Sequence, residues 1–452
     1  MPLPLHRLLA IAFAAGLAGI AAIPASATAQ RLTQASLRAM AANLLPQAEK
    51  LSGLKARRPI HVAVRTRKQL HAELVALAAA DSSPDRNASA VVLQRLGLMK
   101  DTANLLDWSI DLTTEELAGY YDPKRDTLYV LSDVPHEGIR AVVLHEIVHA
   151  LQDQYVPLDS LHATGRGNGD RALAVRAAIE GQATLAMFLY QVRELGIARP
   201  GSDPLPDLSA IPRDLLIPPA IEPLMAAAPR IVRDEAAFPY MSGAGFVQLL
   251  QRKHPGAFPF GDNLPVSTEQ VLDPERALLD RRDDPTEIHL GPRAATKETG
   301  VGGASRGGEG GAATRADAAT GRDATGGTAA AGPWKVRVED TFGQFALTIF
   351  LLERYSLQSA SLARGWDGDR YQLLADGSHN VLVWYILWDS PAAARRFADA
   401  YRQILHTRLG RSGSVEQLEV DGRSVVRIVD AEEGADISTL PRPEIRLERT
   451  AR

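Results

Sequence analysis

The chain has 452 residues, of which 45% are hydrophobic and 23% are charged, so it has enough apolar side chains for a folded protein with a sizeable core. Its 50 Lys and Arg residues nearly balance 54 Asp and Glu residues, for a formal net charge of −4, and we expect no nucleic-acid partner. The absence of cysteine excludes disulfide scaffolds, thiolate metal sites and cysteine nucleophiles. Any metal must therefore be bound by His, Asp or Glu.

Residues 1–29 resemble a secretory signal peptide. Arg7 precedes an uncharged apolar run from Leu8 to Ile23, and Ala27-Thr28-Ala29, or the similar tripeptide two residues earlier, supplies a cleavage site. The run is shorter than the roughly 20 residues that a membrane-spanning helix needs. An uncleaved anchor stays open as an alternative. We expect an exported protein, periplasmic or secreted, with no stable membrane span once the signal is removed.

Residues 30–290 are predicted to form the first folded domain, which begins with a helical lead-in. Leu and Ala at helical spacing flank a predicted strand at 59–64. Aromatic and β-branched residues alternate from 119 to 131 around an Asp-Pro turn, which predicts a β-hairpin. Helices are then predicted at 135–154, 171–195 and 242–253.

Residues 291–333 are predicted to be a flexible linker or surface insertion, because 21 of the 33 residues from 300 to 332 are Gly or Ala. Residues 334–452 are predicted to form a smaller α+β domain. Its expected elements are helices at 341–354 and 391–406, strands at 371–374 and 381–388, and a hairpin of 415–420 with 424–428.

The sequence His145-Glu146-Ile147-Val148-His149 is an HExxH motif on the helix predicted at 135–154. Two histidines four residues apart lie on one helical face, so both imidazoles can bind one zinc ion. Zinc lowers the pKa of a bound water and polarises a substrate carbonyl, and Glu146 can take the proton of that water. The motif therefore predicts metal-assisted hydrolysis, with a surface helix that happens to carry two histidines as the alternative.

A catalytic zinc typically has three protein ligands, and the longer HExxHxxGxxH pattern is missing here. Glu180 is the candidate third ligand, because small and apolar residues surround it and an unpaired carboxylate is costly to bury there. An exposed helical glutamate is the alternative. The predicted cofactor is one catalytic Zn²⁺ held by His145, His149 and Glu180.

These motifs resemble those of the gluzincin metallopeptidases, which carry HExxH on one helix and a glutamate ligand on a later one. His145–Gln154, Ile179–Gly181 and Phe238–Gly243 look most like exported bacterial and archaeal gluzincin-like proteins. The resemblance covers about residues 117–274 and implies a zincin-like domain in which a sheet edge strand and helices form the active site. An extended peptide would then pair along the strand Thr127–Leu131. Thermolysin-like members carry an Asp where this chain has Thr184.

Several residues are candidates for supporting roles. Asp153 and Asp170 are candidates to accept the other N–H of a ligand histidine, with ordinary capping or solvation as the alternative. The resemblance also implies Tyr240 as a donor to the reaction oxyanion, with a core tyrosine as the alternative. The weaker candidates are His162 and His254, and Gly365–Asp369 is interpreted as a packed turn with ligand binding as the alternative.

The predicted function is an exported zinc-dependent metallopeptidase that acts on a peptide or protein substrate with Glu146 as general base. Two alternatives stay open. One is a zinc-stabilised binding or assembly protein of the cell envelope, whose partner binds through the C-terminal domain. The other is a zinc hydrolase of a non-peptide amide or ester.

Overall fold

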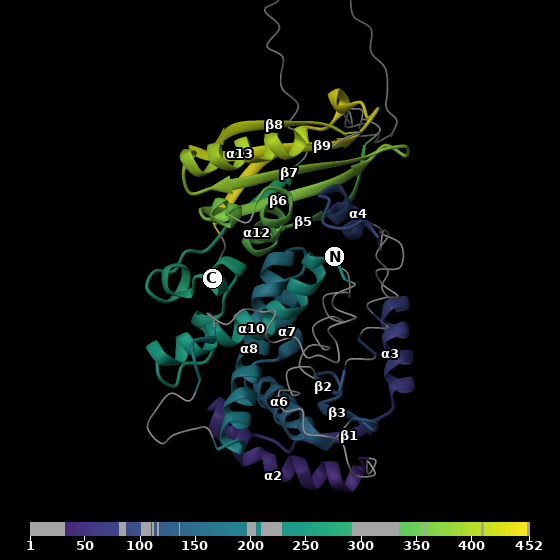
Figure 1. Cartoon of the computed structure of the whole chain (residues 1–452), viewed down its shortest axis with the longest axis vertical. Coiled ribbons are helices and arrows are strands. Elements are labelled where there is room, and N and C mark those ends of the chain that lie inside the picture. The colour runs from purple at the N-terminus through teal and green to yellow at the C-terminus, as the bar shows by residue number, and fades with distance from the viewer. Residues whose placement is uncertain are drawn as a thin grey trace, which may run out of the picture.

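A computed structural model of the chain describes residues 32–80, 87–100, 110, 113–114, 117–134, 136–196, 205–208, 228–291, 334–356, 358–407 and 411–449 (Figure 1). Helices and several separate sheets make this a mixed α and β protein, in agreement with the predicted α+β class. The predicted signal peptide and residues 292–333 of the predicted linker lie outside the described residues.

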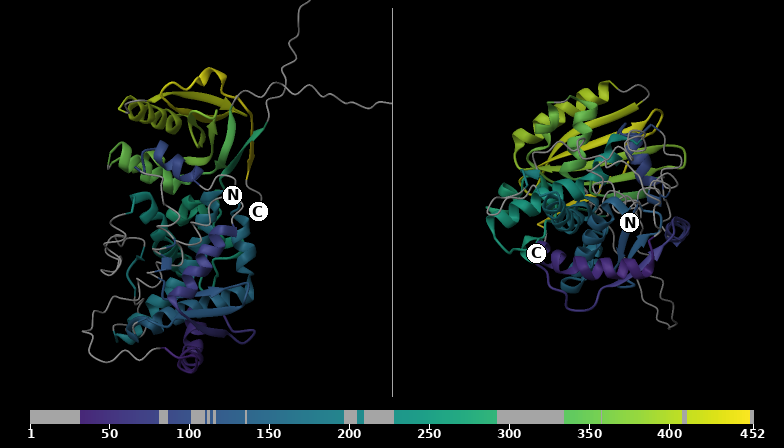
Figure 2. Two further views of the ribbon diagram at one scale, coloured as in Figure 1. Left: turned by 90° about the vertical axis from the view of Figure 1, so that its right-hand side faces the viewer. Right: turned by 60° about the horizontal axis from the view of Figure 1, so that its bottom comes forward.

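The first region is mostly helical and lies at one end of the molecule, with the C-terminal sheet at the other; of its helices, α4 lies beside that sheet (Figures 1 and 2). Polar side chains cap the starts of two of its helices: Thr33 and Ser36 form a capping box before α2, and Asn168 accepts a hydrogen bond from the backbone N–H of Arg171 at the start of α8. The helices described here are α2 (Gln34–Ser52), α3 (Arg67–Ala80), α4 (Ala88–Arg95), α6 (His136–Tyr155), α7 (Leu158–Thr164), α8 (Gly169–Glu194), α10 (Arg230–Lys253) and α11 (Thr268–Leu272), with single turns at Gly261–Asn263 and Glu275–Leu279.

A three-stranded sheet in this region has the order β1-β3-β2, where β1 is His61–Arg65, β2 is Gly119–Asp122 and β3 is Thr127–Leu131. The strand β3 pairs in parallel with β1 and antiparallel with β2. The prediction that a substrate pairs along Thr127–Leu131 is therefore wrong, because both edges of this strand already bind neighbouring strands. Within the described part of the chain, β2 pairs with β3 alone, and no strand pairs with its other edge.

The helix α8 is long and apolar enough to cross a membrane by length and composition, but 83% of its most apolar window is buried inside the protein. A helix that is apolar on all sides is typical of a buried core helix. Its neighbours are α6 and α10, so it forms the centre of the helical region (Figure 1).

The helix α10 crosses α8 at two glycines. A methyl group on Gly243 would lie 2.2 Å from the backbone O of Ala177, and one on Gly181 would lie 2.2 Å from the backbone C of Gly243. Only glycine fits this close approach. The helix begins twelve residues before the predicted 242–253 segment, because packing against α8 holds Pro239 inside a helix that propensity alone would end there.

The C-terminal region contains a five-stranded antiparallel sheet of order β5-β6-β7-β9-β8. Residues of β7 alternate between its two faces: Leu382, Trp384 and Ile386 pack toward the helices, while Val383 and Tyr385 pack on the opposite face. The elements are β5 (Lys335–Asp340), α12 (Gly343–Arg354), the single turn Ser359–Ala363, β6 (Trp366–Ala375), β7 (Asn380–Trp388), α13 (Pro391–His406), β8 (Arg411–Val420), β9 (Arg423–Glu432), the single turn Ile437–Thr439 and β10 (Glu444–Arg449).

The two regions share packing. The strand β4 (Thr286–Gly291), which follows the helical region in sequence, pairs antiparallel with β10 near the end of the chain. One hydrophobic core joins residues of α6, α8 and α10 to α12, α13 and one face of the C-terminal sheet. The predicted turn at Gly365–Asp369 is instead the start of β6, with a bulge between Trp366 and Gly368. The predicted packing is present, since Trp366 and Asp369 are buried and Nε1 of Trp366 donates to Asp369.

Candidate metal centre

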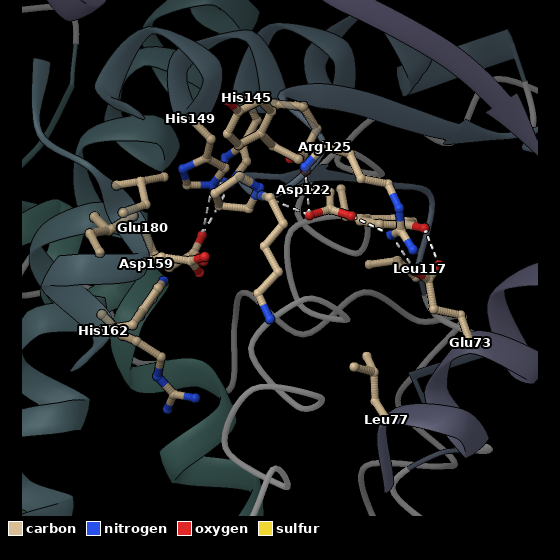
Figure 3. Close-up of a pocket in the computed structure, with 18 of the residues that line it drawn as sticks. Glu73, Leu77, Leu117, Asp122, Arg125, His145, His149, Asp159, His162 and Glu180 are labelled. Atoms are coloured by element: carbon tan, nitrogen blue, oxygen red, sulfur yellow. Dashed lines mark hydrogen bonds and ion pairs between the residues drawn. The ribbon is translucent and has the colours of Figure 1, made fainter. Parts of the chain in front are cut away.

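Two helices bring the predicted ligands together. His145 and His149 project from α6 toward Glu180 of α8, as Figure 3 shows. The two Nε2 atoms are 3.0 Å apart, and each lies 3.2 Å from Oε2 of Glu180. All three side chains are largely shielded from solvent. The spacing of four residues within the motif and the crossing of α6 with α8 thus place three metal-binding atoms at one point.

These distances fit one small cation. A tetrahedral zinc site holds nitrogen and oxygen at roughly 2.0–2.1 Å, which places neighbouring donor atoms about 3.3 Å apart. The observed separations of 3.0 to 3.2 Å agree with that value. Among the described residues no fourth His or carboxylate joins the group, so three protein ligands would leave a coordination position open for water or substrate.

The electrostatics of the cluster favour a positive charge among its three members. Burial alone would lower the pKa of His149, but the Glu180 carboxylate outweighs it and raises that pKa to about 9. Burial alone would raise the pKa of Glu180, but His149 and His145 hold it well below its ordinary value. The carboxylate is therefore ionised and requires a cation beside it, which a bound metal can supply.

Gln152 holds the ring of His149. Its Oε1 lies 2.8 Å from Nδ1 of His149, so an N–H at Nδ1 donates to Gln152 and leaves Nε2 free to bind metal. The amide of Gln152 then donates to the backbone O of Ile179 and to Gln182, and Gln182 donates to the backbone O of Ser52. The neutral amides of Gln152 and Gln182 thus fix the orientation of the His149 ring from the side opposite its metal-binding nitrogen.

The predictions for Asp153 and Asp170 are wrong. Asp153 forms an ion pair with Arg58 and accepts hydrogen bonds from Tyr121 and the backbone of Leu158. Asp170 accepts hydrogen bonds from Thr268 near the C-terminal region. Asp153 is already engaged by these partners, so Gln152 takes the position at Nδ1 of His149. Asp170 lies ten residues before Glu180 on α8, about 15 Å along the helix and away from the metal ligands.

Glu146 lies between the metal ligands and the small sheet. Its side chain is 3% exposed, and the backbone N–H of Tyr121 on β2 donates a hydrogen bond to its carboxylate. Burial raises the pKa of Glu146 to about 7, with His149 opposing the shift. A carboxylate whose pKa lies near neutrality can both accept and return a proton.

Tyr240 belongs to α10 and is fully buried. Its ring centre lies 6.2 Å from that of His145, and its side chain lines the same cavity as the three ligands. Burial raises the pKa of Tyr240 well above its ordinary value, so the hydroxyl keeps its proton and can donate it in a hydrogen bond. The crossing of α8 and α10 at Gly181 and Gly243 places Tyr240 here, one helical turn before Gly243.

The ligands line a cavity of about 480 Å³. It extends from His145 and Glu180 past β2 to the apolar side chains of α3, including Leu77 (Figure 3). His162 lines this cavity, as the sequence suggested, whereas His254 ends α10 and is not among the lining residues. The cavity thus offers metal ligands at one end and an apolar wall at the other.

Two residues that sequence reasoning missed are Gln152 and Arg176. Gln152 follows His149 by three residues, and Arg176 precedes Glu180 by four, so each lies on the same helical face as a ligand. A search of these helical faces for polar residues would have found both.

Comparisons with known proteins place few constraints on this site. Residues 334–441 match a family described as a domain of unknown function (DUF8575), which lies outside the metal-binding helices and covers less than half of the chain. No curated protein matches the chain. A crystal structure from Chloroflexus aurantiacus, described as "a putative hydrolase with a novel fold", is similar over 61% of this chain and 96% of its own, at 16% identity and a TM-score of 0.32. A score of this size carries no argument about function.

Proposed function

We propose that this protein is a zinc-dependent metallopeptidase of the gluzincin type. The observation that carries the proposal is the convergence of His145, His149 and Glu180 on one point, with the buried carboxylate of Glu146 on the same helix as the two histidines. A structural zinc site needs no such carboxylate, whereas hydrolysis needs a base beside the reacting water.

The residues of the site are proposed to have separate roles in hydrolysis. Zinc, when bound by His145, His149 and Glu180, supplies a Lewis acid that polarises a carbonyl and makes water a better nucleophile. Glu146 takes the proton of the attacking water and returns it to the leaving nitrogen. Burial raises the pKa of this carboxyl group, which favours its taking up the proton. Tyr240 is proposed to donate a hydrogen bond to the oxygen on which negative charge develops.

The open edge of β2 is the proposed binding place for an extended peptide. The backbone N–H of Leu131 donates to the backbone O of Ala118, which sets the alternation of paired residues along β2. The N–H and C=O groups of Gly119 and Tyr121 then face away from β3. The N–H of Tyr121 donates to Glu146, so the C=O of Tyr121 and the backbone groups of Gly119 are proposed to bind the peptide, which would lie beside that carboxylate. This arrangement also supports a zincin-like fold for the region.

The test is cleavage of an unfolded protein by the purified, zinc-loaded enzyme. We expect the wild type to cut the substrate, a chelator to stop cleavage, and Glu146→Gln to retain one zinc per chain while losing activity by at least about 100-fold. The matched control is Glu194→Gln, which makes the same change at an exposed position at the end of α8. A wild-type protein that holds one zinc and cuts no peptide bond would overturn the proposal.

We further propose that the protein is exported. The support is the charged start, apolar run and small-residue cleavage site of residues 1–29. N-terminal sequencing of the protein recovered from the periplasm or medium of an expressing bacterium is expected to begin just after Ala27 or Ala29. Recovery of a chain that still begins at Met1 in the membrane fraction would contradict export with cleavage.

A further inference from the structure

A buried arginine faces the metal-lined cavity without a partner. Arg176 lies on α8 four residues before Glu180, and its side chain lines the cavity together with Glu180 and Tyr240. The residue is 6% exposed, and its Nε and Nη1 atoms are buried with no hydrogen-bond partner. No carboxylate among the described residues forms an ion pair with it.

Other buried arginines of this protein are paired. Arg95 is 6% exposed and lies 2.8 Å from a carboxylate oxygen of Glu432. Arg427 is 4% exposed and lies 3.1 Å from Glu416, with a second hydrogen bond to Tyr385. A guanidinium that is buried without an acceptor is costly, and proteins retain one where a ligand brings the acceptor.

The acids near Arg176 do not supply this acceptor. Glu180 is engaged by both ligand histidines. Glu235, from α10, interacts with Arg176 through charge alone and lines a different cavity, which Arg176 also reaches, on the side toward β5. The partner of the guanidinium is therefore expected from the metal-lined cavity, where the substrate would bind.

We propose that Arg176 recognises a carboxylate of the substrate beside the metal ligands. The inference rests on the proposed peptidase function and adds the class of peptide that the site prefers. A carboxylate matches the planar fork of a guanidinium with two parallel hydrogen bonds and carries the opposite charge, whereas a peptide carbonyl supplies neither. The carboxylate has two sources, the C-terminus of a peptide or the side chain of an Asp or Glu next to the scissile bond.

Four peptide probes separate these sources: N-acetyl-Ala-Ala-Ala with a free C-terminus, the same peptide as an amide, and N-acetyl-Ala-Asp-Ala and N-acetyl-Ala-Asn-Ala, both as amides. Their affinities for the zinc-loaded Glu146→Gln protein are measured by calorimetry, and their kcat/KM values with Glu146 intact. We expect one carboxylate probe to bind about 10- to 100-fold more tightly than its neutral counterpart. Which of the two it is identifies the source.

The variant Arg176→Gln tests whether this residue is responsible. We expect it to keep one zinc per chain and to lose the preference for carboxylate, while Arg176→Lys keeps part of it. If the wild type binds charged and neutral probes equally, or if folded Arg176→Gln retains the full preference, the inference is wrong. Carboxylate binding that depends on Arg176 without peptide cleavage would support the anion site and overturn the peptidase proposal, so the two failures are distinguishable.

Discussion

Buried carboxylates serve opposite purposes in the two regions of this protein. In the C-terminal region, Asp369 accepts four hydrogen bonds, from the backbone N–H groups of Phe342 and Gly343 and from the indole N–H groups of Trp366 and Trp384. In the helical region, Glu180 meets only two imidazoles that point at the same oxygen. The first carboxylate is satisfied by the fold, and the second requires a cation.

This difference in hydrogen bonding distinguishes a carboxylate that stabilises the fold from one that belongs to the candidate metal centre. A buried polar group that the fold satisfies completely fixes a connection, here the start of α12 against β6 and β7. At the metal-lined cavity, Nδ1 of His145 and two guanidinium nitrogens of Arg176 lack hydrogen-bond partners among the described residues, and buried atoms such as Nε1 of Trp388 lack them elsewhere. At this cavity, the incomplete hydrogen bonding leaves polar atoms available to a ligand.

The largest expected effect is on the free energy of unfolding, when the carboxylates of Asp369 and Glu180 are removed in separate variants. Asp369→Ala leaves four buried N–H donors without an acceptor, and we expect the free energy of unfolding to fall by at least about 4 kcal/mol. Glu180→Gln should reduce the stability of chelator-treated protein by less than half as much, because His149 can release its proton whereas an N–H donor cannot. Urea unfolding measures both changes. Equal losses of unfolding free energy in the two variants would contradict the proposed difference between a carboxylate that the fold satisfies and one that requires a cation.

The crossing of α8 and α10 gives the next effect. Gly243→Ala places a methyl group 2.2 Å from the backbone O of Ala177, so the helices must move apart, and we expect a loss of about 1–3 kcal/mol although alanine favours helix formation. Activity should fall as well, because Tyr240 moves with α10. Gly291→Ala is the control, since the nearest atom there is 3.8 Å away. An unchanged unfolding midpoint in Gly243→Ala would contradict the tight crossing.

Removal of the Gln152 amide, which holds the His149 ring, is expected to have a smaller effect, on zinc affinity alone. Gln152→Ala removes the acceptor at Nδ1 of His149, and we expect zinc affinity to fall about 10- to 100-fold. Competition with a chromophoric chelator measures the change. Gln152→Glu should restore affinity because it keeps an acceptor, and Gln154→Ala is a control on the same helix that contacts Arg57 and Arg58 instead. Equal affinities in wild type and Gln152→Ala would show that Gln152 does not position the ligand.

Much of the fold follows from local sequence pattern. The helix at Pro391–His406 has the predicted bounds, because Ser390 caps it and Pro391 suits its first turn. The β6–β7 and β8–β9 pairs were predicted from Asp-Gly turns and alternation. The order β1-β3-β2 was not, because pairing between strands distant in sequence depends on tertiary packing.

In the candidate site too, some residues could be predicted from local sequence and others depend on tertiary packing. The spacing of His145 and His149 sets their common face in any helix, so the sequence could predict this pair. Glu180 was predicted from its apolar surroundings, and its position beside the histidines depends on the crossing of α6 and α8. The assignments to Asp153 and Asp170 failed because a carboxylate was expected where the chain uses the neutral amide of Gln152.

The last prediction concerns the pH dependence of stability through Asp170, which lies at the junction of the two regions. Burial, with help from the nearby carboxylates Asp369 and Asp340, raises the pKa of Asp170 from 3.8 to about 7, although hydrogen bonds from Thr268 oppose the shift. The folded state therefore binds a proton more tightly than the unfolded state. This contribution to stability is fully present below pH 3.8 and is lost as the pH rises toward 7, by at most about 1.4 kcal/mol per pH unit.

Asp170→Asn replaces this carboxyl with a group that does not titrate. We expect urea unfolding midpoints of the variant to fall less steeply than those of the wild type between pH 4 and pH 7, and the two curves to run parallel above pH 8. Asp273→Asn is the control, because it makes the same change at the end of α11 in a side chain that is not fully buried. Curves for Asp170→Asn and wild type that stay parallel from pH 4 to pH 7 would mean that Asp170 is ionised throughout, as a carboxylate satisfied by the scaffold would be.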